Sequence, residues 1–200
     1  MLISSELLRL FASGDRIVGF RPIGQDIKSS VMASFSEIEW LNSYFDSSSH
    51  RINEKSAQSV LYFALIWNLF ESRACNKNAN TKSIADKVNE VYSKGLLQLS
   101  DFSPFLAYYQ DRYLSKGQIN DTFCKLNFRH NDKKELIEAV LKCELDDINN
   151  IVLALLLIIL RLRNNLFHGE KNIYTLSCQI DNFKVANQVL SKFLDMLKHY

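Results

Sequence analysis

Apolar residues recur at helical spacing along most of the chain, and one segment is apolar on every side. Ile151 to Leu160 is an unbroken run of ten apolar residues. That run is too short to cross a bilayer, which needs about 20 residues, and asparagines and arginines flank it. Its length favours a buried helix over a buried strand, which periodicity alone does not exclude. We therefore expect a central helix over residues 149–168 and no membrane partner.

The remaining periodicity predicts further helices packed around this one. Ser34 and Ser36 each precede a glutamate at capping-box spacing, which indicates a helix start. The helix over 52–75 has a densely apolar centre and is expected to pack against the central helix. In the segment 96–113, aromatic residues follow the spacing of a helix core, which favours packing over base stacking. The other helices are expected over residues 1–13, 34–45, 83–94, 118–128, 132–144 and 181–199.

Glycine and proline are rare and concentrated near the N-terminus. The chain has six glycines and two prolines, and three of the glycines and one proline fall within residues 14–30. That segment is expected to form a loop or small hairpin. Two hundred residues suit one domain with its own core. We therefore predict a single all-α domain over 1–200, with residues 1–33 as an N-terminal extension and 34–200 as a helical bundle.

Charge narrows the choice of partners only slightly. The net charge of +2 is too small to require a nucleic-acid partner, so any RNA binding must depend on local clusters. The densest basic cluster is residues 129–134 together with Lys125. Asp132 and Glu135 have capping-box spacing, which places this cluster at a helix start, either as a phosphate site or as an ordinary solvated terminus.

Cysteine and histidine usage indicates an intracellular protein without a metal centre. The four cysteines are widely scattered, which is typical of reduced thiols in the cytoplasm. No signal peptide is evident. The four histidines show no zinc-ligand spacing. We expect a cytoplasmic location, no metal and no cofactor.

Polar side chains at the end of the central helix are the main candidates for chemistry. At 100° per residue, Arg163 and His168 lie about 140° apart, whereas Asn164 and His168 share a face. A second copy related by a two-fold axis would bring two arginines and two histidines into one cleft, which motivates a homodimer. The alternative is that Arg163 and His168 merely cap the negative end of the helix.

The end of the helix over 52–75 adds two charged candidates. Glu71 and Arg73 lie in its last turn. An acidic residue closing one core helix and a basic residue closing another could meet at the same end of the bundle. The alternative is a solvated charge pair.

The string RNNLFH at residues 163–168 resembles the Arg-x4-6-His motif of the HEPN superfamily. The resemblance includes a polar residue directly after the arginine, and Gly169 and Lys171 are also similar to many members. It implies a helical bundle that dimerises. In active members of that family, two such motifs form a metal-independent endoribonuclease site. Some HEPN toxins carry a modified tyrosine two residues after the histidine, where this chain has Glu170.

These residue types suit RNA cleavage by attack of the 2′-hydroxyl. His168 titrates near neutral pH and can transfer the protons. Arg163 stays charged and can bind phosphate oxygens in pairs, and Asn164 can orient His168 or hold a phosphate oxygen. Cleavage would leave 2′,3′-cyclic phosphate and 5′-hydroxyl ends. Further RNA contacts are expected from Arg161, Lys171, Glu71 and Arg73.

The resemblance favours a toxin or phage-defence ribonuclease, with an antitoxin or defence-system protein as a possible partner. Two other hypotheses stay open. One is a catalytically silent HEPN module that binds RNA or a nucleotide. The other is a structural or interaction subunit, such as an antitoxin partner.

Overall fold

The computed structural model describes residues 35–44, 51–167 and 179–198. The chain divides into two units, residues 1–40 and 41–200. The helix expected over 1–13 and the loop expected over 14–30 lie outside the described residues. Helix α3, Glu37–Tyr44, spans the boundary between the units. The hydroxyl of Ser36 accepts a hydrogen bond from the Glu39 amide at 3.3 Å, so the start expected at Ser36 is confirmed.

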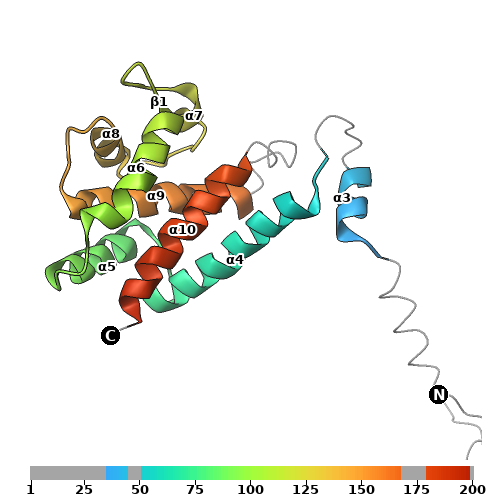
Figure 1. Ribbon diagram of the computed structural model, residues 1–200, viewed down its shortest axis with the longest axis horizontal. Helices are drawn as coiled ribbons and strands as arrows, with labels where there is room; N and C mark the ends of the chain where they lie inside the picture. Colours follow the sequence, from blue (N-terminus) through green and yellow to red (C-terminus); the bar gives the residue numbers. More distant parts are fainter. Residues whose placement is uncertain (1–34, 45–50, 168–178, 199–200) are drawn as a thin grey trace, which may run out of the picture. The chain divides into compact units, whose positions relative to one another are not determined.

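The described part of the chain is mostly helical, which confirms the all-α prediction (Figure 1). Short connections join the helices of the larger unit. A hairpin of two-residue strands, β1 and β2, is the sole sheet among the described residues. The helices of this unit are α4 Glu54–Ala74, α5 Thr81–Ser93, α6 Leu99–Tyr113, α7 Asp121–Cys124, α8 Lys134–Leu141, α9 Ile148–Phe167 and α10 Ile180–Leu197.

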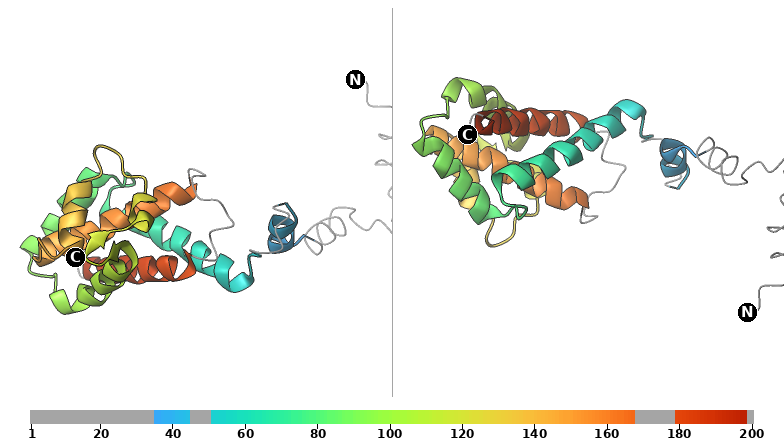
Figure 2. Two further views of the ribbon diagram at one scale, coloured as in Figure 1. Left: turned by 90° about the horizontal axis from the view of Figure 1, so that it is seen from above. Right: turned by 90° about the horizontal axis from the view of Figure 1, so that it is seen from below.

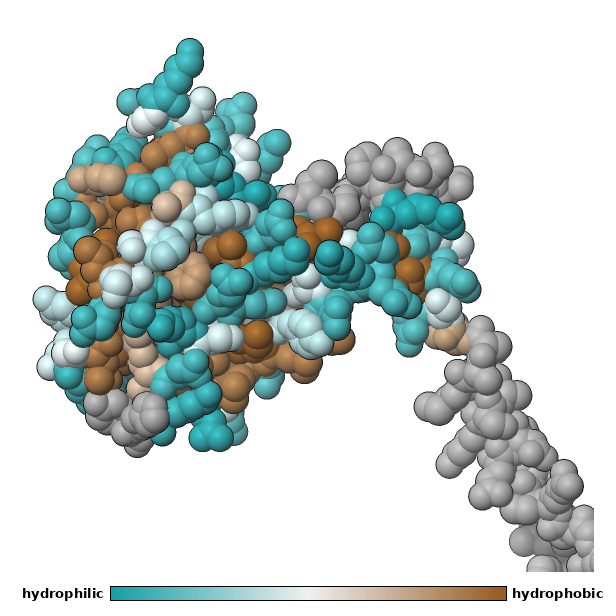
Figure 3. All heavy atoms as spheres, in the orientation of Figure 1, coloured by the Kyte–Doolittle hydropathy of each residue, from teal (hydrophilic) through white to brown (hydrophobic). Residues whose placement is uncertain are grey.

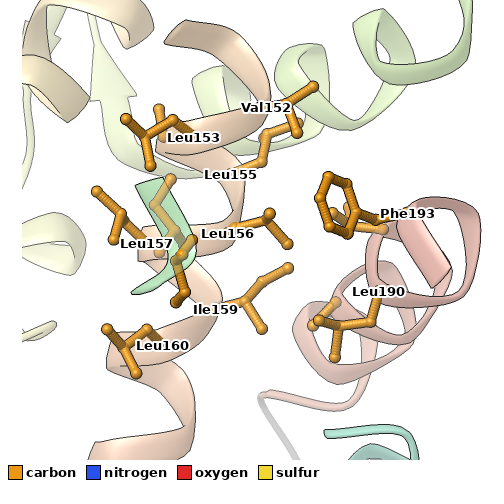
Figure 4. Close-up of a cluster of buried hydrophobic side chains, with 14 of the residues drawn as sticks. Val152, Leu153, Leu155, Leu156, Leu157, Ile159, Leu160, Leu190 and Phe193 are labelled. Carbon is orange, nitrogen blue, oxygen red and sulfur yellow. The ribbon is translucent and has the colours of Figure 1, made fainter. Parts of the chain in front are cut away.

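Helix α9 is the centre of the larger unit. Every residue from Ile151 to Leu162 is buried, and α5, α6, α8 and α10 pack around the helix (Figure 2). In Figure 4, Leu156 and Ile159 point from α9 toward Leu190 and Phe193 of α10. The helix is long and apolar enough to cross a membrane, but 72% of its apolar window is buried inside the structure. It therefore serves as the core helix of a soluble helical domain.

Helix α4 was expected to pack against the central helix. It meets α9 where Trp67 and Glu71 contact Arg163, but it packs mainly on α10. Aromatic residues carry this contact: the ring centres of Phe63 and Phe183 lie 5.1 Å apart, and those of Phe70 and Phe193 lie 6.0 Å apart. The two helices lie side by side in Figure 1. Because α5, α6, α8 and α10 already cover α9, the apolar stripe of α4 is matched by the inner face of α10 instead.

The segment expected to form one helix over 118–128 begins as a strand. Strand β1, Leu114–Ser115, pairs antiparallel with β2, Gln118–Ile119. Lys116 and Gly117 connect them with φ of 52° and 74°. A tight hairpin turn needs positive φ at both central residues, and the glycine supplies one at no steric cost. Helix α7 starts after this hairpin.

The aromatic residues of α6 belong to the core, as their spacing predicts. Phe102, Tyr109 and Tyr113 are at most 1% exposed. The rings of Tyr109 and Tyr113 stack on each other with an interplanar angle of 2°. A base therefore cannot reach these rings from solvent.

The outer side of α4 carries a row of exposed apolar side chains, which we call the α4 leucine row. Its members, Leu61, Tyr62, Leu65 and Leu69, are between 47% and 59% exposed. No charged residue lies between Lys55 and Glu71 on this helix. Figure 3 shows brown, hydrophobic atoms along the lower edge of the unit, where α4 runs.

These burial differences predict opposite outcomes for two leucine truncations. Leu155→Ala should lower the free energy of unfolding by about 2–5 kcal/mol, because it leaves a cavity beside α9, where Leu155 is fully buried. Leu65→Ala, the matched control on the leucine row, should change it by less than about 0.5 kcal/mol. Urea unfolding followed by circular dichroism measures both. Equal losses would show that Leu65 is covered in solution.

Candidate functional site

Arg163 lies in the last turn of α9, where the helix leaves the core. The carbon of its guanidinium lies 5.5 Å from the ring centre of Phe167 and 5.9 Å from that of Trp67 on α4. Both are cation–π distances. The side chain is 29% exposed. Two aromatic rings thus hold a charged group in place at the surface.

Glu71 of α4 lies beside the same guanidinium. Its Oε2 is 3.9 Å from Nη2 of Arg163, while its Oε1 accepts a hydrogen bond from the Ala79 amide at 3.1 Å. The sequence raised this meeting of two helix ends as one of two possibilities, and the structure shows it. At this separation and partial exposure, the pair contributes at most about 1 kcal/mol.

Asn164 completes the described part of the site. Its Oδ1 accepts a hydrogen bond from Nη1 of Arg163 at 3.2 Å. Arg163, Asn164 and Glu71 are therefore in contact as a group. His168 and Lys171 lie outside the described residues, so their expected positions stay predictions.

Arg73 does not join this group. It is exposed and lines a groove of about 530 Å³ between the C-terminal ends of α4 and α10, together with Leu69 and Leu194. Residues two apart on a helix point to different sides, so Glu71 and Arg73 face different neighbours. Nothing in this arrangement connects Arg73 to Arg163.

Arg161 is buried, which overturns its expected position at the RNA surface. It is 2% exposed. Its Nε donates to the Leu126 carbonyl at 3.0 Å, and its Nη2 donates to the Asn127 carbonyl. Its Nη1 lies 3.2 Å from Oδ2 of Asp132. The guanidinium is engaged inside the protein, and we assign it a structural role.

Asn165 ties the same loop to α9. Its Nδ2 donates to the carbonyls of Leu126 and Lys125 at 3.0 and 3.3 Å, and its Oδ1 accepts from Arg161 at 3.3 Å. Asn165 is 1% exposed. We call residues 125–132 the anchored loop, because Arg161 and Asn165 together hold its backbone.

The capping box expected at Asp132 and Glu135 is absent. Asp132 instead accepts from the Arg129 amide at 2.6 Å and pairs with Arg161. Lys133 stands at the start of α8 with φ of 51° and no side-chain cap. Leaving a buried guanidinium without a counter-charge costs more free energy than leaving a helix end without a side-chain cap. The cationic residues around Asp132 are exposed, which fits the solvated alternative for this cluster.

Sequence reasoning missed Trp67 and Phe167, which hold Arg163. Phe167 follows Arg163 by four residues, and Trp67 precedes Glu71 by four, so each shares a helix face with its neighbour. The sequence also contains a signal that Arg161 is buried, because this residue directly follows the all-apolar run. Asp132 is the one acidic residue within the basic cluster over 129–134.

The comparisons and the metal survey assign nothing further to this site. Within residues 35–44, 51–167 and 179–198, no three His, Cys, Asp or Glu side chains are grouped so that they could hold a metal ion. No family model, curated protein or solved structure matches the chain. Its function is therefore inferred from the site itself and from the resemblance of its motif.

The two arginines should respond differently to truncation. Arg161→Ala should lower the free energy of unfolding by about 3–5 kcal/mol, because it leaves Asp132 as an unpaired buried charge. Arg163→Ala should cost about 1 kcal/mol or less. Denaturant unfolding of both variants tests this difference. Adding Asp132→Asn should recover part of the loss in Arg161→Ala; a purely additive double variant would contradict the pairing.

Proposed function

We propose that this chain is a metal-independent endoribonuclease of the HEPN type, acting in the cytoplasm as a toxin or phage-defence effector. One observation carries the proposal. The arginine of the RNNLFH motif stands partly exposed at the end of the buried helix, fixed between Trp67 and Phe167 and in contact with Asn164. That is a preorganised cation next to an amide, as phosphate binding requires.

Arg163 suits a phosphodiester because its present partner is weakly held. Glu71 lies 3.9 Å away, beyond hydrogen-bond distance. A phosphate can form two parallel, charge-assisted hydrogen bonds with a guanidinium. The amide of Asn164 offers N–H donors beside it. An RNA phosphate can therefore bind Arg163 more tightly than Glu71 does.

The proposed reaction uses the nucleophile of the RNA itself. His168 takes the proton from the 2′-hydroxyl, the 2′-oxygen attacks phosphorus, and the 5′-oxygen leaves with a proton. Arg163 stabilises the negative charge of the phosphorane. The products are a 2′,3′-cyclic phosphate and a 5′-hydroxyl end. In a homodimer, the second copy supplies a second Arg163 and His168, and one histidine can act as base and the other as acid.

The surface beside Arg163 supports self-association. Phe167 is 55% exposed although it is a large aromatic residue. Exposed aromatics of this kind are common anchors of protein interfaces. A two-fold contact centred on Phe167 would bring the two copies of Arg163 together. An antitoxin or defence-system protein is the other partner that we propose.

A silent HEPN module that binds RNA or a nucleotide, or a structural subunit, is the alternative. The observation that favours it is the carboxylate of Glu71 beside Arg163. A negative charge next to the cation repels a bound phosphate and fits a helix-end ion pair equally well.

RNA cleavage by purified protein tests the proposal. In the presence of a chelator, wild type should cut single-stranded RNA, and Arg163→Ala and His168→Ala should each lose at least about 100-fold in rate. Arg73→Ala is the matched control, because it removes a cation that does not contact Arg163, and it should cut like wild type. Equal activity in all four proteins would remove the site assignment. Activity that the chelator abolishes would contradict the metal-free mechanism.

Replacing Glu71 tests whether its carboxylate opposes RNA binding at Arg163. Glu71→Gln should tighten RNA binding about three- to tenfold at low salt, because it frees Arg163 for phosphate. Glu54→Gln makes the same change in charge at the far end of α4 and is the control. Fluorescence anisotropy with labelled RNA measures both affinities. Equal effects would mean that Glu71 does not oppose binding at Arg163, and no RNA binding by any variant would favour the structural subunit.

A further inference from the structure

A small polar cavity lies where α6, α7 and the first turn of α10 meet. It measures about 40 Å³. Arg112 and Tyr113 of α6, Lys125 after α7, and Asn182 of α10 contribute to its walls, and none of its described lining residues carries a carboxylate. A cavity of this volume holds about three water molecules, which is comparable in size to one tetrahedral oxyanion.

Several buried polar atoms around this cavity make no well-aligned hydrogen bond. They are Nε of Arg112, the hydroxyl of Tyr113 and Oδ1 of Asn182, although the Tyr113 hydroxyl lies close enough to the side chains of Asn182 and Arg112 to interact with both. Tyr113 and Asn182 are each 1% exposed. Buried polar groups are nearly always satisfied. Nε of Arg112 and the Tyr113 hydroxyl are donors that an anion can satisfy, whereas Oδ1 of Asn182 is an acceptor and does not favour one.

Among the described residues, two cations and no carboxylate line the cavity, although Asp181 and Asp111 lie close enough to influence the neighbouring Tyr108. Arg112 forms no ion pair with the described carboxylates, and its Nη2 donates to the neutral Oε1 of Gln179 at 3.2 Å. The acidic residue of this turn, Asp181, pairs with Lys184 instead. Lys125 adds a second cation at the exposed side of the cavity. Partial burial of a charge without a counter-charge is costly, and an anion would remove that cost.

The start of α10 adds to this preference. Gln179 occupies the position before the helix and provides no side-chain cap to its first amides. The first turn of a helix presents N–H groups and the positive end of the helix dipole. Asn182, in this turn, lines the cavity. A helix of 18 residues therefore begins beside the two cations.

We propose that this cavity binds a phosphate group. Arg112 and the Tyr113 hydroxyl donate to its oxygens, the first turn of α10 stabilises its charge, and Lys125 closes the open side. Burial raises the pKa of Tyr113 to about 12, although Arg112 opposes the shift, so the hydroxyl keeps its proton at neutral pH and acts as a donor.

The phosphate cavity is distinct from the Arg163 site but is connected to it. Leu126 lines the cavity, and its carbonyl accepts hydrogen bonds from Arg161 and Asn165 of α9. The anchored loop thus joins the cavity to α9, the helix that carries Arg163. The phosphate has two possible sources with the same chemistry: free phosphate or a phosphomonoester, and the backbone of a bound RNA.

Isothermal titration calorimetry of the full chain with inorganic phosphate tests the proposal. Wild type should bind one phosphate, and Tyr113→Phe, which keeps the buried ring, should bind about tenfold more weakly after losing one charge-assisted hydrogen bond. Arg112→Gln should show no binding. Lys116→Gln, which removes an exposed cation from the nearby hairpin, is the matched control and should bind like wild type.

Three outcomes would overturn the proposal. If wild type shows no heat of binding when phosphate is added, the cavity is filled by water. Equal binding by Arg112→Gln and wild type would place the phosphate elsewhere. Loss of binding in Arg163→Ala with retention in Arg112→Gln would place it at the end of α9. The unfolding temperature of each variant without phosphate shows whether a loss of binding reflects a loss of fold.

A second titration identifies the source. Competition by short single-stranded RNA against phosphate in wild type, together with weaker direct binding of that RNA by Arg112→Gln, would assign the cavity to the RNA backbone. Binding of phosphate or a nucleoside 5′-monophosphate without competition by RNA would assign it to a free ligand. Neither arm measures cleavage, so a chain that binds phosphate but does not cut RNA would refute the proposed nuclease and leave this site intact.

Discussion

Burial of α9 on all sides is the constraint on which the rest of this structure depends. From Ile151 to Leu162 every residue of this helix is buried, as is Asn165, so a polar side chain at these positions must find its partners within the protein. Arg161 and Asn165 do so by binding the backbone and carboxylate of residues 126–132. The consequence is an anchored loop whose position is set by the central helix, although it has little regular structure of its own.

The same constraint determines which polar residues of α9 are available for chemistry. Arg161 is enclosed, whereas Arg163, two residues on, leaves the core between Trp67 and Phe167. The guanidinium at the surface is therefore held by packing rather than by strong ion pairs. A group with fixed geometry and weakly held charge is suited to a ligand that brings its own negative charge. The phosphate that we propose beside Arg112 would likewise meet a cation at a fixed position.

Sequence patterns predicted the elements better than their partners. The central helix, the stripe of α5 and the inner face of α10 follow from local periodicity, which Ile84, Val88 and Phe193 display in their burial. The pairing of α4 with α10 depends on how several helices share one apolar surface, which local spacing does not encode. The role of Arg161 was missed for a related reason: its counter-charge, Asp132, lies in a distant segment and looked like a helix cap. The grouping of Glu71 with Arg163 was one of two possibilities because both close core helices.

The α4 leucine row has a consequence for how the proposed nuclease site could be controlled. Leu65 precedes Trp67 by two residues, which places it about 200° around the helix axis. The row therefore faces away from the side of α4 that touches Arg163. A protein that covered these leucines would leave the guanidinium open to a nucleic acid. A partner that blocks Arg163 would have to bind on the side of Phe167. Binding of a partner to the α4 leucine row and inhibition of the proposed site at Arg163 would therefore be independent of each other.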